Sequence, residues 1–185
     1  SLPVIDDALR VRILNAPLPH PESVDACALF EEALSWDVDA LDAEKMAVLM
    51  GLLSLPLYRD VALIQWATSI EQGRETLAEQ RAFVDGTPVS DRIGGVLIGK
   101  GPRPEVARLQ AALALCRVGA AHAPVEDCGA ALLVACGWLS WAMGASTPAA
   151  FYIGLAQAAD PTLSMARLLA EMVDRGMLPD WVFTR

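Results

Sequence analysis

The chain has 185 residues, of which 54% are hydrophobic and 20% are charged, so it buries enough apolar surface to fold and is not a disordered segment. Its net charge of −9, with no run of lysine or arginine, excludes nucleic acid as a natural partner, because phosphate binding needs concentrated positive charge. The apolar residues are mainly Ala, Leu and Val. Since Ala and Leu are strong helix formers, we predict an all-α fold, an array of antiparallel helical hairpins.

Four cysteines occur without any Cys-x-x-Cys pair, each in an apolar helical context: Cys27, Cys116, Cys128 and Cys136. This spacing favours small buried residues in a reducing compartment over a disulfide framework or a metal site. No basic segment followed by an apolar stretch opens the sequence, as it would in a signal peptide, and we therefore expect a cytoplasmic protein.

One uncharged stretch, residues 128–159, has to be weighed as a membrane span because it contains no Asp, Glu, Lys or Arg. A spanning helix needs about 20 apolar residues. Acidic residues flank this stretch, no basic residue anchors it, and Ser146-Thr147-Pro148 interrupts it. We expect two helices buried against each other and no membrane contact.

Residues 1–83 form the front half of a single predicted helical domain, and prolines and capping residues divide them into four elements. The first element is an extended arm or short strand over 1–22, and the second is a helix from the N-cap Ser23 to Leu34. The third is a helix that begins at the N-cap Asp42 and ends at Pro56. The fourth is a helix from Tyr58 to Ile70, with 71–81 as a candidate solvated continuation.

Residues 84–104 are rich in glycine and proline and predict an irregular loop that separates the front half from the back half, 105–185. The apolar piece 93–98 inside this loop is compatible with a strand or with a helical turn. The back half contains four predicted helices. The first two cover 105–121 and 124–143, the latter with Pro124 in its first turn. The third is capped by Ser146 or Thr147 and ends at Asp160-Pro161, and the fourth is amphipathic, runs from about Met165 to Val173 and ends at Gly176. The second of these is apolar nearly all round, as a central buried helix is.

Residues 130–163 form one predicted tetratricopeptide-like hairpin. Small residues stand where two antiparallel helices approach most closely, and a proline stands where the next helix begins: Gly137, Gly144, Ala149, Ala156 and the pair Asp160-Pro161. Only one such repeat is visible, so we expect degenerate helical pairs elsewhere.

The back half also resembles a known family in the order of three sequence features. These are a tryptophan pair at Trp138 and Trp141, the sequence Ala-Ala-Asp-Pro at 158–161, and Leu-Leu-Ala-Glu at 168–171. The same order is typical of the C-terminal part of an actinobacterial family, domain of unknown function 4192. The segment 52–60, with Arg59-Asp60, is similar to the segment that precedes the central helix of that family.

This resemblance covers residues 45–185. It implies a further N-terminal half, so the chain is expected to be a C-terminal fragment of a longer protein. No activity or catalytic residue is carried over from the family.

No motif predicts catalysis or cofactor binding. The segment 94–101 satisfies G-x-x-x-x-G-K, but Gly101 stands where a P-loop needs Ser or Thr for magnesium, and prolines delay the helix that should face the phosphates. No Gly-x-Ser-x-Gly sequence occurs.

Metal binding is likewise not predicted. The segment with Asp37, Asp39 and Asp42 lacks the Gly and the Glu that a calcium-binding loop needs, so we predict a solvated acidic turn there. The two histidines, His20 and His122, have no Cys or carboxylate at ligand spacing. We therefore predict no catalytic, cofactor or metal residue.

The candidate interaction surface consists of Trp138 and Trp141, which share one helix face, and Trp66. Tryptophan is the residue most enriched in binding hot spots. Core packing is the competing interpretation for all three residues.

The function predicted from these features is a helical-repeat protein-interaction or scaffold domain. Its expected partner is another protein, the family's own N-terminal half or a second copy of the chain. The alternative is part of an enzyme whose site an absent N-terminal half completes, with Arg59-Asp60 and the 84–104 loop at its edge.

Overall fold

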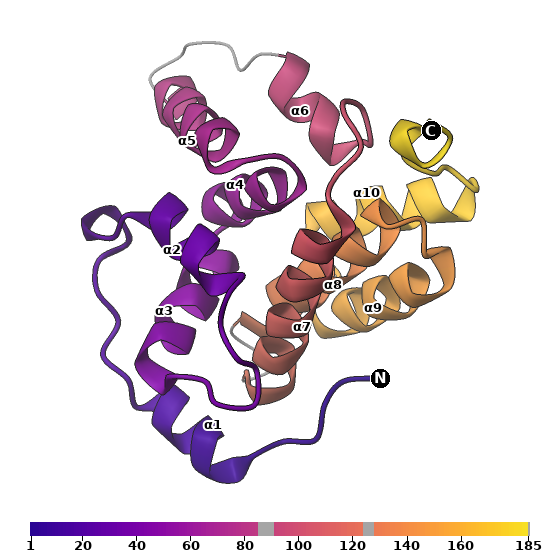
Figure 1. Cartoon of the computed structure of the whole chain (residues 1–185). Coiled ribbons are helices and arrows are strands. Elements are labelled where there is room, and N and C mark those ends of the chain that lie inside the picture. The colour runs from indigo at the N-terminus through magenta and orange to yellow at the C-terminus, as the bar shows by residue number, and fades with distance from the viewer. Residues whose placement is uncertain (85–90, 124–127, 185) are drawn as a thin grey trace.

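The computed structural model describes residues 1–84, 91–123 and 128–184, and within them the fold contains helices and no strand, which confirms the all-α prediction (Figure 1). The helices are α1 (Asp7–Leu14), α2 (Ala26–Ala33), α3 (Ala43–Ser54), α4 (Pro56–Ala67), α5 (Ile70–Val84), α6 (Asp91–Leu97), α7 (Val106–His122), α8 (Ala130–Ala142), α9 (Ser146–Ala159) and α10 (Ser164–Asp174). Two 3-10 turns, η1 (Pro21–Ser23) and η3 (Asp180–Val182), precede α2 and follow α10.

The centre of the fold is α8, in which every residue is buried and none is charged, as the sequence predicted for this helix. Helices α7, α9, α4, α3 and α10 pack against it. Small residues bring α9 close to α8: a Cβ at Gly137 would lie 2.8 Å from the side chain of Ile153, and Ala149 and Ala156 are fully buried. The finer tetratricopeptide-like description of this pair stays a prediction.

Helices α3 and α4 follow each other with a sharp bend. The carboxylate of Asp42 accepts the N–H of Lys45 at 3.0 Å and caps α3 as predicted. Pro56 does more than stop that helix, because it is the first residue of α4, where no N–H donor is needed. Within the described residues no single helix has the length and apolar composition of a membrane span, although α3 and α4, bent by 107°, together meet that criterion as a broken span.

The N-terminal segment contains a helix where an arm or strand was predicted. The Asp6 carboxylate accepts the N–H groups of Ala8 and Leu9, which starts α1. Leu9 and Ile13, four residues apart, are both buried against the body of the protein. The prolines that suggested an extended arm lie on either side of this helix and not within it.

The cap of α2 also differs from the prediction. Ser23 ends η1, and its hydroxyl donates to the carbonyl oxygen of His20 at 2.7 Å. Asp25 caps α2 instead by accepting the N–H of Ala28 at 3.1 Å. Both residue types cap helices well, so their local preferences left the choice open.

The helix predicted over 58–70 is α4, and its candidate continuation over 71–81 is a separate helix, α5. Thr68 leaves the helical conformation, with φ −129° and ψ −98°, and its hydroxyl donates to the carbonyl oxygen of Ile64 at 2.6 Å. The hydroxyl of Ser69 then accepts the N–H of Gln72 at 3.3 Å at the start of α5. Hydroxyl side chains compete in this way with the helical backbone bonds, and here they end one helix and begin the next.

The segment 84–104 is not irregular throughout, because α6 occupies 91–97. The apolar piece 93–98 is therefore helical as far as Leu97, while 85–90 lie outside the described residues. Seven residues are too few for an isolated helix to be stable. Contacts with α4 and a hydrogen bond of 2.9 Å from the indole of Trp138 to the carbonyl oxygen of Leu97 hold α6 in place.

The remaining back-half helices begin and end close to their predicted limits. Gly144 and Gly176 end α8 and α10 with φ of 78° and 67°, as glycines at this position do. Helix α9 begins at Ser146 itself and has no side-chain cap, so the predicted capping role of that hydroxyl is wrong. Residues 124–127, with Pro124, lie outside the described residues.

Gly99 joins the end of α6 to the C-terminal segment. Its φ is +86°, and its carbonyl oxygen accepts the N–H of Asp180 at 2.8 Å. A Cβ on this residue would lie 2.6 Å from the Cα of Pro179 and 2.8 Å from the ring of Trp141. Only glycine satisfies both the left-handed backbone and this close approach.

We expect Gly99→Ala to lower the free energy of unfolding by more than about 3 kcal/mol, since left-handed strain adds to a backbone clash. The matched control is Gly176→Ala, which also has a positive φ but no atom within 4 Å of the added Cβ, and which should cost about 1 kcal/mol. Urea unfolding of both variants measures the difference. Equal losses would show that the Pro179 contact is unimportant.

Candidate functional site

The three tryptophans selected from the sequence are fully buried. Each indole N–H donates to a backbone carbonyl oxygen inside the protein: Trp66 to Phe30 at 3.0 Å, Trp138 to Leu97 at 2.9 Å and Trp141 to Met177 at 2.8 Å. These side chains therefore line no exposed surface, which corrects the expectation that they form a binding surface. An indole whose N–H is satisfied internally buries its large apolar area without penalty.

His122, at the end of α7, is buried and uses both of its ring nitrogens. Its Nε2 accepts the N–H of Asp6 at 3.0 Å, and its Nδ1 donates to the carbonyl oxygen of Val118 at 2.8 Å. The hydrogen-bond pattern assigns the proton to Nδ1. His122 thus attaches the N-terminal segment to α7 and has no free nitrogen for a ligand or for proton transfer.

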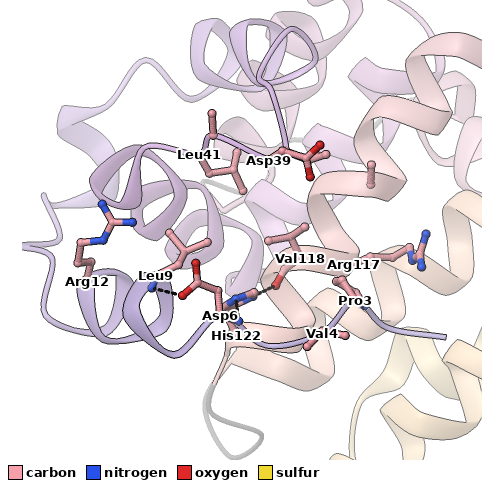
Figure 2. Close-up of a pocket in the computed structure, with 13 residues that line it drawn as sticks. Pro3, Val4, Asp6, Leu9, Arg12, Asp39, Leu41, Arg117, Val118 and His122 are labelled. Carbon is pink, nitrogen blue, oxygen red and sulfur yellow. Dashed lines mark hydrogen bonds between the residues drawn. The ribbon is translucent and has the colours of Figure 1, made fainter.

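A hollow of about 390 Å³ opens beside His122 between the N-terminal segment, residues 38–41 and α7 (Figure 2). Its charged side chains do not converge: Figure 2 shows the guanidinium groups of Arg12 and Arg117 on opposite sides of the hollow. Arg117 donates to the carbonyl oxygen of Ser1 at 2.6 Å. Arg117 thus helps to hold the N-terminal segment against α7.

A second polar cluster joins α2 to α7. Arg108 forms two parallel hydrogen bonds with Glu31, of 2.5 and 2.9 Å, and also donates to the carbonyl oxygen of Gln65 at 3.2 Å. The amide of Gln65 donates to Glu31 at 3.0 Å. Hydrogen bonds from Arg108 lower the pKa of the Glu31 carboxyl, and Glu31 in turn raises the pKa of Arg108. This pairing connects the two halves of the chain.

The Arg59-Asp60 pair, predicted to lie at the edge of an enzyme site, is a neighbouring ion pair on α4. Arg59, a residue that is 3% exposed, donates through its guanidinium to the Asp60 carboxylate at 3.1 and 3.2 Å. Its Nη1 has no hydrogen-bond partner in the described part of the chain. Burial raises the pKa of Asp60, and the charge of Arg59 opposes that shift.

Cys27, Cys116 and Cys136 are buried thiols that form no disulfide. Burial raises the pKa of Cys27 and Cys136, and raises that of Cys116 to about 12. Because the thiolate is the nucleophile, these three thiols are inert at neutral pH. Across residues 1–84, 91–123 and 128–184, no three His, Cys, Asp or Glu side chains are placed to hold a metal ion.

An apolar opening of about 260 Å³ lies between α3 and the segment 18–24. Its lining is almost entirely apolar and consists of Leu18, Pro19, Pro21, Val24, Val48, Gly51, Leu52, Ser54 and Leu55. Leu18 is 62% exposed and Leu55 39%. A Cβ on Gly51 would already lie 3.7 Å from Leu18, so the missing side chain at this position keeps the opening clear.

A second hollow, of about 460 Å³, shares Pro21 with the first and is lined by both apolar and polar residues: His20, Pro21, Glu22, Leu57, Tyr58 and Arg81. We call the two openings together the α3 groove. None of its residues was predicted from the sequence to be a binding residue. A glycine in the middle of an apolar helix, Gly51, was the available signal, but the approach of the segment 18–24 to α3 is a tertiary feature.

No protein-family model, curated protein or solved structure matches this chain. The resemblance to domain of unknown function 4192 therefore stays a prediction. The α3 groove is defined as a candidate site by its own geometry.

The Glu31–Arg108 pair predicts a pH dependence of stability. A carboxyl whose pKa is lowered by folding stabilises the protein above its unfolded pKa, and this contribution disappears as the pH falls through the folded value. We expect Glu31→Gln to lower the free energy of unfolding by only about 1–2 kcal/mol near neutral pH, because solvent screens part of the ion pair. Between about pH 6 and pH 3 the free energy of unfolding of the variant should fall less than that of the wild type.

The measurement is urea unfolding of wild type and variant across this pH range. Glu32→Gln is the matched control, because Glu32 pairs with Lys45 on the exposed surface and should have little effect. Parallel pH profiles for the wild type and Glu31→Gln would contradict the assignment.

Proposed function

We propose that this chain is a helical protein-interaction or scaffold domain, and that the α3 groove is its binding surface. The observation that carries the proposal is an open, apolar-lined groove beside α3 in which Leu18 and Leu55 remain exposed. Exposed apolar surface that is contiguous and concave is typical of sites that bind another protein segment. The partner is another protein, a further part of a longer chain or a second copy of this one.

The shape of the groove supports a peptide segment as the occupant. One wall is a helix with a gap at Gly51, and the other is a proline-containing strip, 18–24, whose backbone is held by η1 and by the Asp25 cap of α2. Proline and helix backbones lose little freedom on binding, so the groove is largely preformed. Apolar side chains of a partner helix or extended segment are the natural complement of such walls.

The polar groups elsewhere in the described structure support interaction over catalysis. His122 has both nitrogens engaged, the Arg108 and Glu31 charges neutralise each other, and the Cys116 thiol stays protonated. Each of these groups has a structural role in joining helices or filling the core.

The alternative proposal is part of an enzyme that another chain segment completes, and Arg59-Asp60 is the observation in its favour. A buried guanidinium nitrogen without a partner and a carboxyl with a raised pKa occur together at many functional sites. Structural ion pairs show the same signs, however, and this pair lines neither half of the α3 groove.

The test of the interaction proposal is to fill the groove. Gly51→Leu places a side chain between α3 and Leu18 while raising helix propensity, so the fold should persist. We expect affinity capture from a native-type lysate, quantified by mass spectrometry, to lose a wild-type partner at least about tenfold with this variant.

Gly154→Leu is the matched control, since Gly154 is also a helical glycine, lies on α9, and has no atom within 4 Å of an added Cβ. Circular dichroism verifies that both variants fold. A partner retained equally by both variants would exclude the α3 groove as its binding surface.

A further inference from the structure

The polar end of the α3 groove contains an arginine and a tyrosine that face the same opening. Arg81, exposed on α5, donates through Nη2 to the Tyr58 hydroxyl at 3.4 Å. The Tyr58 side chain is only 6% exposed, yet it lines the hollow together with Arg81. A nearly buried hydroxyl and a guanidinium thus meet at the end of an apolar groove.

The Tyr58 hydroxyl and the Arg81 guanidinium have N–H or O–H donors that are not used within the described part of the chain. The Tyr58 hydroxyl accepts from Arg81, so its own proton remains available, and no hydrogen bond links it to an acceptor among the described residues. Arg81 forms no ion pair with a carboxylate in the described part of the chain, although its guanidinium has five N–H donors. Among the described residues neither group donates to a carboxylate, and one anionic oxygen of a ligand can accept from both.

Two other polar residues lie on the same rim. The Glu22 N–H donates to Nδ1 of His20 at 3.3 Å, which shapes η1, and none of the described ion pairs joins the Glu22 carboxylate to Arg81. The carboxylate of Glu22 reduces the positive potential of the rim. Arg81 and Glu22 carry opposite charges, so a carboxylate at this end would be held by hydrogen bonds from Arg81 and Tyr58 and not by net charge.

We propose that the Arg81–Tyr58 end of the α3 groove binds the C-terminal carboxylate of an apolar peptide segment whose last side chains occupy the apolar part beside Gly51. This inference rests on the proposed interaction function and specifies the chemistry of the partner. The net charge of −9 disfavours partners that carry several Asp or Glu residues, whereas a chain terminus supplies one carboxylate on an otherwise apolar segment.

The experiment uses the full chain and two fluorescein-labelled peptides of the sequence Ala-Leu-Val-Leu, one with a free C-terminal carboxylate and one with a C-terminal amide. Fluorescence polarisation measures the dissociation constant of each. We expect the acid to bind the wild type about tenfold more tightly than the amide, which corresponds to one charge-assisted interaction. Arg81→Gln should remove this preference and leave amide binding unchanged, and Tyr58→Phe should reduce the preference severalfold.

Arg175→Gln is the control, because Arg175 is an exposed arginine on α10, distant in sequence from the groove residues. Equal affinity of acid and amide for the wild type, or a preference that survives Arg81→Gln, would refute the carboxylate inference while the interaction function stands. If neither peptide binds at about 1 mM, the carboxylate inference is refuted. The interaction function would still stand if Gly51→Leu abolishes capture of a wild-type partner.

Discussion

The back half of this protein depends on the need of each buried indole N–H for an acceptor. Trp138, Trp141 and Trp181 form a chain of ring contacts, with successive centroids 6.4 Å apart, and their N–H groups donate to carbonyl oxygens at the ends of other elements. Leaving one such donor unpaired costs about 1–3 kcal/mol. The bonds therefore hold α6, α8 and the C-terminal segment in one arrangement, and Gly99 provides the close approach that this arrangement requires.

The two halves of the chain use their polar residues for attachment. Glu31 and Arg108 join α2 to α7, and His122 joins the N-terminal segment to α7. Apolar residues fill the space around α8. The α3 groove is different, because Gly51 and the strip 18–24 leave apolar walls apart where a longer side chain would close them. This gap is the surface on which the proposed function rests.

Local sequence signals located those elements whose ends are specified by nearby residues. Asp42 at the start of α3 and Gly176 at the end of α10 were both predicted, since capping and left-handed termination act within a few residues. The break at Thr68 and the helix α1 were missed. In both places several local choices are close in energy, and packing against the rest of the chain selects among them.

The sequence by itself determined the helical class, the burial of α8 and the absence of a recognisable catalytic motif, because composition, periodicity and motif chemistry do not depend on distant contacts. Only the tertiary structure decided that Trp66, Trp138 and Trp141 are core residues, and that Tyr58 and Arg81 meet beside the segment 18–24. Whether a large side chain is buried or exposed follows from which helices cover it, and no local spacing contains that information.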